Sequence, residues 1–149
     1  MIESMIAKRS VRSAWAAMSQ DHIDTDALLK QWADDAVWDG TSELGVGQTI
    51  KGKKAIADWF HIWEQEFPKR NLIAKNVCLK GTCLPSPNNI TMVDWTCIET
   101  DKQGREYKYD GVTVIHMRNM KVVRVTEHVS FAGLPPISSL IKPTGKAQA

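Results

Sequence analysis

The sequence is poor in cysteine, in net charge and in histidine, and each shortage excludes a class of protein. Cys78, Cys83 and Cys97 are odd in number and lack C-x-x-C spacing, so we expect neither a disulfide framework nor a zinc knuckle, but buried, reduced thiols. The net charge is only +2, too small for the basic surface of a nucleic-acid-binding protein. The four histidines form no metal-ligand cluster, and the chain has no G-x-G-x-x-G or phosphate-loop pattern. We therefore expect no metal and no organic cofactor.

Long apolar runs are also missing. No segment approaches the length of about 20 apolar residues that spans a bilayer, and no charged-then-apolar leader opens the chain. These absences predict a cytoplasmic protein with neither a membrane nor a nucleic acid as its partner.

The composition is that of one ordinary folded domain. The chain has 149 residues, of which 43% are apolar and 24% are charged, and this balance leaves no case for disorder. Pro135, Pro136 and Pro143 lie in the tail, so we expect residues 132–149 to form an extended C-terminal arm.

Apolar residues at helical spacing predict three helices in the first half of the chain. The expected helices span about residues 2–19, 24–35 and 53–67, and Pro68 ends the third. A short edge strand over 36–39 and a glycine-rich loop over 40–52 should separate the second helix from the third.

From Asn71 onward the apolar period changes from 3.6 to 2, which predicts strands. Four strands are expected, over residues 72–80, 90–100, 105–118 and 121–131. Because the connections between them are short, an antiparallel meander is the expected topology. Helices followed by a long antiparallel sheet indicate an α+β fold in which one sheet face is buried under the helices.

Glu127 interrupts the apolar face of the last predicted strand. Alternation places Val123, Val125, Val129 and Phe131 on the same face as this carboxylate. A desolvated, unpaired carboxylate costs several kcal/mol or takes up a proton, so we interpret Glu127 as a candidate for chemistry. The alternative is a strand-end carboxylate that faces solvent or pairs with Arg124.

Four segments resemble the SnoaL-like branch of the nuclear transport factor 2 superfamily. They are LKQWADDAVW (29–38), IKGKKAIADWF (50–60), GVTVIHM (111–117) and KVVRVTEH (121–128). The resemblance implies a cone-shaped, curved antiparallel sheet wrapped around N-terminal helices, with one deep pocket. It implies a single SnoaL-like domain over residues 1–149, with a core over about 5–131.

The superfamily includes polyketide cyclases, ketosteroid isomerases, limonene epoxide hydrolases and scytalone dehydratases, alongside members that only bind or assemble. Its enzymes share a pocket carboxylate that acts as a general acid or base, and by this resemblance that carboxylate is Glu127. The isomerase pattern requires an Asp where this chain has Gly40 and a Tyr near Ala16. The epoxide hydrolase pattern requires an Arg near Asp94. Neither pattern is present.

The family-like register predicts a second acid in the pocket. It turns Met92, Asp94, Thr96 and Ile98 inward, together with Tyr109, Gly111, Thr113 and Ile115 of the next strand. Asp94 would then share the cavity with Glu127, and two carboxylates in an apolar site should separate into one protonated acid and one base. The alternative places Asp94 at the sheet rim beside a Lys or Arg.

Large side chains are expected to form the pocket walls. Tryptophan rings can hold a planar ligand, although each is also a candidate for the core. Tyr109 is a candidate oxyanion donor or a core residue. The expected walls are Trp15, Trp38, Trp59, Trp63, Met92, Tyr109, Thr113, Val125 and Val129.

The opposite sheet face predicts a homodimer. Val93, Trp95, Cys97, Val112 and Val114 fall on this face by alternation. An antiparallel sheet that is apolar on both faces needs a cover on the second, and a second copy of the chain is the expected one.

Two functions remain open from the sequence. The first is a cofactor-independent cyclase, isomerase, dehydratase or hydrolase that acts on a small hydrophobic carbonyl or epoxide. The second is a non-catalytic ligand-binding or dimeric assembly module. Inward-facing carboxyls at positions 94 and 127 favour the enzyme, and outward-facing ones favour the binding module.

Overall fold

A computed structural model describes residues 2–40, 49–83 and 88–130, and in these ranges the chain forms three helices and a six-stranded sheet. The helices are α1 (Ile2–Met18), α2 (Thr25–Leu28) and α3 (Lys53–Glu66). The strands are β1 (Trp32–Asp39), β2 (Thr49–Lys51), β3 (Lys69–Thr82), β4 (Asn88–Thr100), β5 (Glu106–Arg118) and β6 (Lys121–Ser130). The predicted arm over 132–149 and Phe131 lie outside the described residues.

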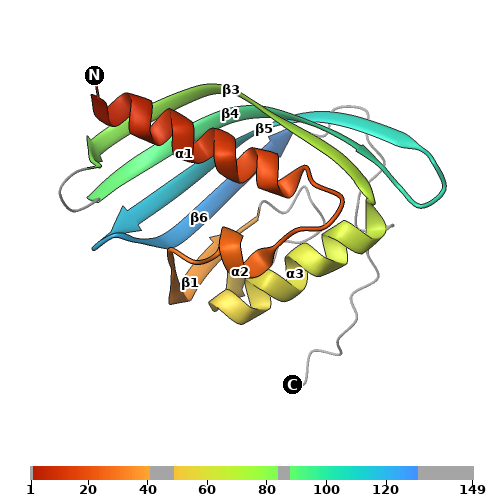
Figure 1. The fold of residues 1–149 in the computed structure, drawn as a ribbon, viewed down its shortest axis with the longest axis horizontal. Coiled ribbons are helices and arrows are strands. Elements are labelled where there is room, and N and C mark those ends of the chain that lie inside the picture. The colour runs from red at the N-terminus through yellow and green to blue at the C-terminus, as the bar shows by residue number, and fades with distance from the viewer. Residues whose placement is uncertain (1, 41–48, 84–87, 131–149) are drawn as a thin grey trace.

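The sheet is curved and does not close, and the helices lie on one side of it (Figure 1). Its strand order is β2-β1-β6-β5-β4-β3, so β3 to β6 form the predicted antiparallel meander. β6 then pairs in parallel with β1, and β2 pairs antiparallel with β1 at the edge. The predicted α+β class is confirmed.

α1 and α3 agree with the helical spacing of their apolar residues. α1 buries Val11, Trp15 and Met18, and α3 buries Phe60 and Trp63. None of the helices in the described ranges is both long and apolar enough to cross a bilayer.

The second helix was predicted too long. Asp24 caps α2 by accepting a hydrogen bond from Ala27 N at 3.0 Å, but the helix ends at Leu28. Trp32 starts β1 instead, because pairing with β6 and burial of Ala36 and Trp38 favour a strand there. The edge position predicted for this strand is also wrong, since β2 lies outside it.

The predicted inward face of β4 is wrong by one residue. Trp95 pairs with Gly111 and Cys97 with Tyr109, and these side chains are buried. Met92, by contrast, is 47% exposed. Because both alternating sets of β4 contain apolar residues, the period alone does not select the face.

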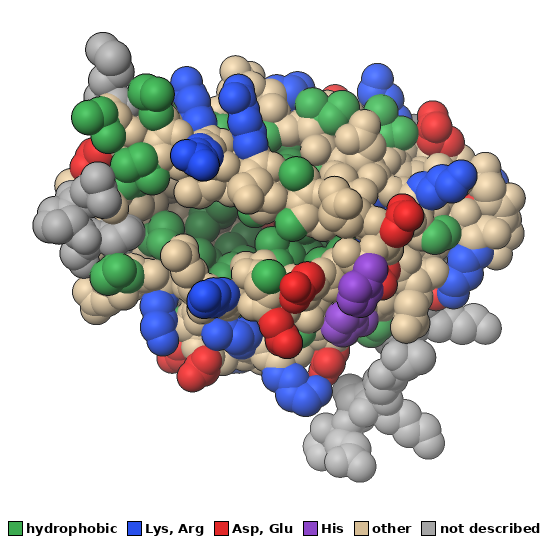
Figure 2. All heavy atoms as spheres, in the orientation of Figure 1, with side chains coloured by type: hydrophobic (Ala, Val, Ile, Leu, Met, Phe, Trp, Pro, Cys, Tyr) green, Lys and Arg blue, Asp and Glu red, His purple; other side chains and the backbone are tan. Residues whose placement is uncertain are grey.

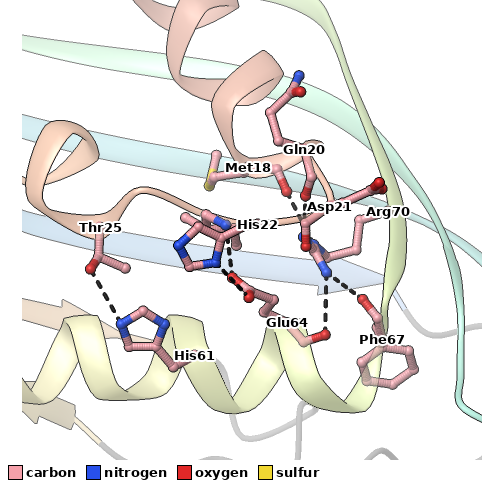
Figure 3. A network of polar contacts seen from close by, with 10 residues as sticks. Met18, Gln20, Asp21, His22, Thr25, His61, Glu64, Phe67 and Arg70 are labelled. Carbon is pink, nitrogen blue, oxygen red and sulfur yellow. Dashed lines mark hydrogen bonds and ion pairs between the residues drawn. The ribbon is translucent and has the colours of Figure 1, made fainter.

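Arg70 joins the ends of α1 and α3 to β3 (Figure 3). The Arg70 residue is only 5% exposed. Its guanidinium donates hydrogen bonds to the carbonyl oxygens of Met18, Gln20 and Phe67. Nearby, Glu64 of α3 accepts a hydrogen bond from Ile23 N at 2.7 Å. These contacts fix the C-terminal end of α1 beside the start of β3.

The three cysteines are free thiols. Cys83 and Cys97 are buried as predicted, whereas Cys78 is exposed because its position on β3 pairs with exposed Met92.

Candidate active site

An aromatic cavity lies between the sheet and the helices. The space that water can occupy inside it is about 50 Å³. Figure 2 shows this face of the molecule hollowed, with hydrophobic side chains in the hollow. The cavity walls are Trp15, Met18, Trp38, Trp59, Phe60, Trp63, Phe67, Leu72, Trp95, Cys97, Glu99, Tyr109, Glu127 and Val129.

Glu127 of β6 faces this cavity and therefore keeps part of its surface accessible. Its Oε1 accepts a hydrogen bond from Thr113 Oγ1 at 3.3 Å, and Thr113 Oγ1 accepts one from Trp95 Nε1 at 2.8 Å. Burial raises the pKa of Glu127 to about 7, although hydrogen bonds from Thr113 and Trp38 favour the ionised form. The carboxyl is thus held in an apolar site by neutral donors.

The alternative pairing of Glu127 with Arg124 is not what the structure has. Arg124 donates to Asp39 Oδ2 of the neighbouring strand β1. Positions 124 and 127 differ in parity, so their side chains emerge on opposite faces of β6.

Glu99 of β4 is a second carboxyl in the cavity, and it is not among the site residues predicted from the sequence. Its side chain is 1% exposed, and its Oε2 accepts a hydrogen bond from Trp63 Nε1 at 2.9 Å. Tyr109 and Cys97 also interact with this carboxyl. Burial raises the pKa of Glu99 to about 7, against the hydrogen bonds and the positive charge of Arg70. The sequence contains a pattern that could have identified Glu99, because this residue continues the alternation of Val93, Trp95 and Cys97.

The two carboxyls lie at different ends of the cavity. Glu127 is opposite Thr113, which is opposite Val93, whereas Glu99 is opposite Tyr107, six residues further along β4. Burial, and not the charge of the other carboxylate, is the main cause of both raised pKa values. The protonation of each carboxyl is therefore set mainly by its own surroundings.

A row of tryptophans connects these two ends. The ring centroids of Trp38 and Trp59 are 4.9 Å apart, and those of Trp59 and Trp63 are 5.8 Å apart. Trp38 interacts with Glu127 at one end, and Trp63 donates to Glu99 at the other.

Most of the predicted wall residues do meet in one place. Seven of the predicted site residues line the cavity: Trp15, Trp38, Trp59, Trp63, Tyr109, Glu127 and Val129. Thr113 contacts Glu127, and Val125 is buried in the adjoining core. Met92 lies outside, because β4 presents its other face to the cavity.

Asp94 is not in the cavity, so the predicted pairing of Asp94 with Glu127 is wrong. Its carboxylate accepts a hydrogen bond from Asn76 Nδ2 at 3.0 Å and forms an ion pair with Lys75 at 3.1 Å. These two contacts lower the pKa of Asp94. The alternative is correct in its Lys partner but not in the rim position, because β4 lies between β5 and β3 and Asp94 is on the outer face.

The carboxyl groups of the cavity can support proton transfer. A carboxyl with a pKa near neutrality is present in both forms at physiological pH, so it can accept a proton and return it. Within the described residues, no three His, Cys, Asp or Glu side chains gather as metal ligands would.

A curved, unclosed sheet with helices on one side is the cone fold that solved nuclear transport factor 2-like proteins share. Residues 11–125 match the SnoaL-like domain family, and the chain belongs to that family. No curated protein matches this sequence.

Several solved structures share the fold. A protein from Jannaschia sp. CCS1, assigned as a SnoaL-like polyketide cyclase, aligns over 92% of this chain and 94% of its own, with 12% identity and a TM-score of 0.72. A protein from Bacillus subtilis, assigned as an isomerase, aligns over 87% and 90%, with 20% identity and a TM-score of 0.66. TerC, co-crystallised with polyporic acid, aligns over 83% and 91%, with 17% identity and a TM-score of 0.67. At these identities the likeness establishes the fold alone.

Proposed function

We propose that this protein is a cofactor-independent enzyme that uses Glu127 as a general acid/base on a small hydrophobic substrate with a carbonyl or an epoxide. One observation carries the proposal: an aromatic cavity holds the Glu127 carboxyl with a pKa raised to about 7, and no cation of the described residues contacts it. Among the described neighbours of Glu127, only neutral donors contact the carboxyl.

The proposed step is proton abstraction from carbon. The Glu127 carboxylate takes a proton from the carbon next to a carbonyl, the electron pair moves to the carbonyl oxygen, and the protonated carboxyl returns the proton elsewhere on the same molecule. Thr113 and Trp38 hold the carboxyl in place. A substrate that fills the space between the aromatic walls displaces water from the cavity, which strengthens electrostatic interactions with the developing charge.

The cavity walls favour a flat and largely apolar substrate. Since a cavity of about 150 Å³ holds benzene, the space of about 50 Å³ seen here requires the aromatic side chains to move apart when a ligand enters. The co-crystal of TerC with polyporic acid supports small-molecule binding within this fold.

Hydrogen exchange in heavy water tests the function without knowledge of the natural substrate. The protein is incubated with a panel of aryl methyl ketones and cyclic enones in D₂O, and exchange at the carbon next to the carbonyl is followed by NMR. Wild type should accelerate exchange of at least one compound, and Glu127→Gln should slow that exchange about 100-fold or more. Asp94→Asn, which removes a carboxylate from the outer side of the sheet, is the matched control and should leave the rate unchanged.

A ligand-binding module is the second candidate. The small volume of the cavity favours it, as does Gly40 at the position where the isomerase pattern has its Asp. Compounds that bind while no panel member exchanges faster than in buffer would support this candidate over the enzyme.

We also propose a homodimer through the outer sheet face, on residues that differ in part from those expected from the sequence. Val93, Trp95 and Cys97 face the cavity, so they do not contribute. Ile73, Met92, Val112 and Val114 lie on the outer face and keep exposed apolar surface. A cytoplasmic location stays a prediction.

A further inference from the structure

Two polar atoms in the cavity wall have no hydrogen-bond partner among the described residues. They are Trp15 Nε1 and Glu99 Oε1, in side chains that are 5% and 1% exposed. Buried polar groups are nearly always paired, and an unpaired one costs about 1–3 kcal/mol. Two such atoms in the wall of one cavity indicate a polar group of a ligand.

The contacts of Arg70 place the two residues that carry these atoms in the same region of the cavity wall. Arg70 pairs with Glu99 across β3 and β4, and its Nε donates to the carbonyl oxygen of Met18 at 3.1 Å. Trp15 lies one helical turn before Met18 on α1. The end of α1 that carries Trp15 therefore lies beside the strand position that carries Glu99.

We propose that Trp15 and Glu99 bind a hydroxyl group of the substrate, at the end of the cavity remote from Glu127. The hydroxyl oxygen accepts a hydrogen bond from Trp15 Nε1, and its hydrogen is donated to Glu99 Oε1. The assignment rests on the proposed function, and it narrows the substrate to an apolar, flat molecule that carries a phenolic or alcoholic hydroxyl away from its reacting carbon.

The donor set selects a hydroxyl over other groups. An indole N–H can only donate, and an ionised carboxylate can only accept. A hydroxyl is a small neutral group that satisfies both. An ammonium group cannot accept from Trp15, and a carbonyl cannot donate to the Glu99 carboxylate.

Calorimetry with phenol and toluene isolates the hydroxyl contacts. The two compounds are similar in size, so both must part the aromatic walls to the same extent. Trp15→Phe removes the indole N–H, and it should weaken phenol binding roughly 3- to 10-fold while toluene binding stays within about 2-fold. Trp32→Phe, which alters a tryptophan outside the cavity wall, should leave both affinities unchanged.

The pH dependence of binding distinguishes a hydroxyl from a carbonyl. Arg70, Cys97, Tyr107 and Tyr109 also face Glu99, and none of them titrates near neutral pH, because burial raises the pKa of both tyrosines and of Cys97. With Glu127→Gln as background, phenol affinity should rise from about pH 6 to 8 as Glu99 ionises. Adding Glu99→Gln should abolish that rise.

Several outcomes overturn the proposal. Equal weakening of phenol and toluene by Trp15→Phe, or no phenol binding at all, would mean that water satisfies the two atoms. Phenol affinity that falls with rising pH would assign a carbonyl-type acceptor to the site. If Trp15→Phe does not fold, the pH comparison still decides. Because calorimetry needs no turnover, a failed exchange assay with positive calorimetry would reject only the enzyme.

Discussion

Three carboxyls of this protein show how surroundings set acidity. Glu127 and Glu99 are surrounded by aromatic rings, and burial raises the pKa of each to about 7. Asp94 lies on the outer side of the sheet, where Asn76 and Lys75 lower its pKa. Contacts in the fold therefore decide which acid can exchange protons near neutral pH, and Asp94 is not one of them.

Stability should depend on pH through Glu127. Its folded pKa of about 7 exceeds its ordinary value of 4.5, so the folded state binds more protons than the unfolded state between these values. The resulting stabilisation is complete below about pH 4.5 and is lost as the pH rises through 7, by on the order of 3 kcal/mol. Denaturant unfolding at several pH values measures this dependence. The free energy of unfolding should vary less with pH for Glu127→Gln than for wild type, and the variant should gain more stability over wild type at pH 8 than at acidic pH.

Identical pH profiles for wild type and Glu127→Gln would contradict the raised pKa. A variant that is less stable than wild type but exchanges substrate protons at the full rate would contradict the catalytic role.

At the level of helices and strands, periodicity predicted α1, α3 and the four long strands, because each has one clear repeat over ten or more residues. It failed for residues 29–35, where the apolar positions fit a helix and a strand equally well. It also failed for β2, whose three residues are too few to show a period.

The prediction of the site residues depended on which face of each strand points inward. The facing of Glu127 followed from the apolar set on β6, and that of Tyr109 from the family-like register of β5. On β4 both faces carry apolar residues, so the choice fell on Asp94 and Glu99 was missed. Pairing with Gly111, which leaves room for the Trp95 ring, settles the facing, and that information is not local to β4.

Gly111 is a position where β5 tolerates no side chain. A Cβ there would lie 2.4 Å from the Trp95 ring, which is packed in the core and donates to Thr113. Gly111→Ala should lower the free energy of unfolding by about 1–3 kcal/mol and displace Trp95. Urea unfolding measures the loss, with Lys108→Ala at an exposed position of the same strand as the control. A Gly111→Ala variant as stable as wild type would show that the ring is free to move.

At the scale of the whole molecule, one sheet face is buried under helices and the other carries a mixture of apolar and charged side chains. On that outer side Lys75 forms ion pairs with Asp94 and Asp110, at 3.1 Å each. Exposed ion pairs contribute little to stability, so the apolar residues beside them provide the main driving force for the proposed dimer.

Light scattering at micromolar concentration should therefore give a dimeric mass for wild type. Val112→Asp places a charge in the proposed interface and should yield a monomer, because an unpaired carboxylate is costly to bury. Met120→Glu, at the exposed β5–β6 turn, changes an apolar side chain away from this face and should leave the dimer intact. A monomeric wild type would refute the interface.

The row of indole rings along the cavity also gives the protein an optical signature. Because the rings of Trp38, Trp59 and Trp63 lie so close together, we expect their electronic transitions to couple and to give an exciton couplet in circular dichroism. The couplet depends on the angles between the rings, and a ligand that enters must push them apart. Ligand entry should therefore change the circular dichroism spectrum of the unlabelled protein. Glu127 and Glu99 each lie beside one end of the row of indole rings that gives this signal.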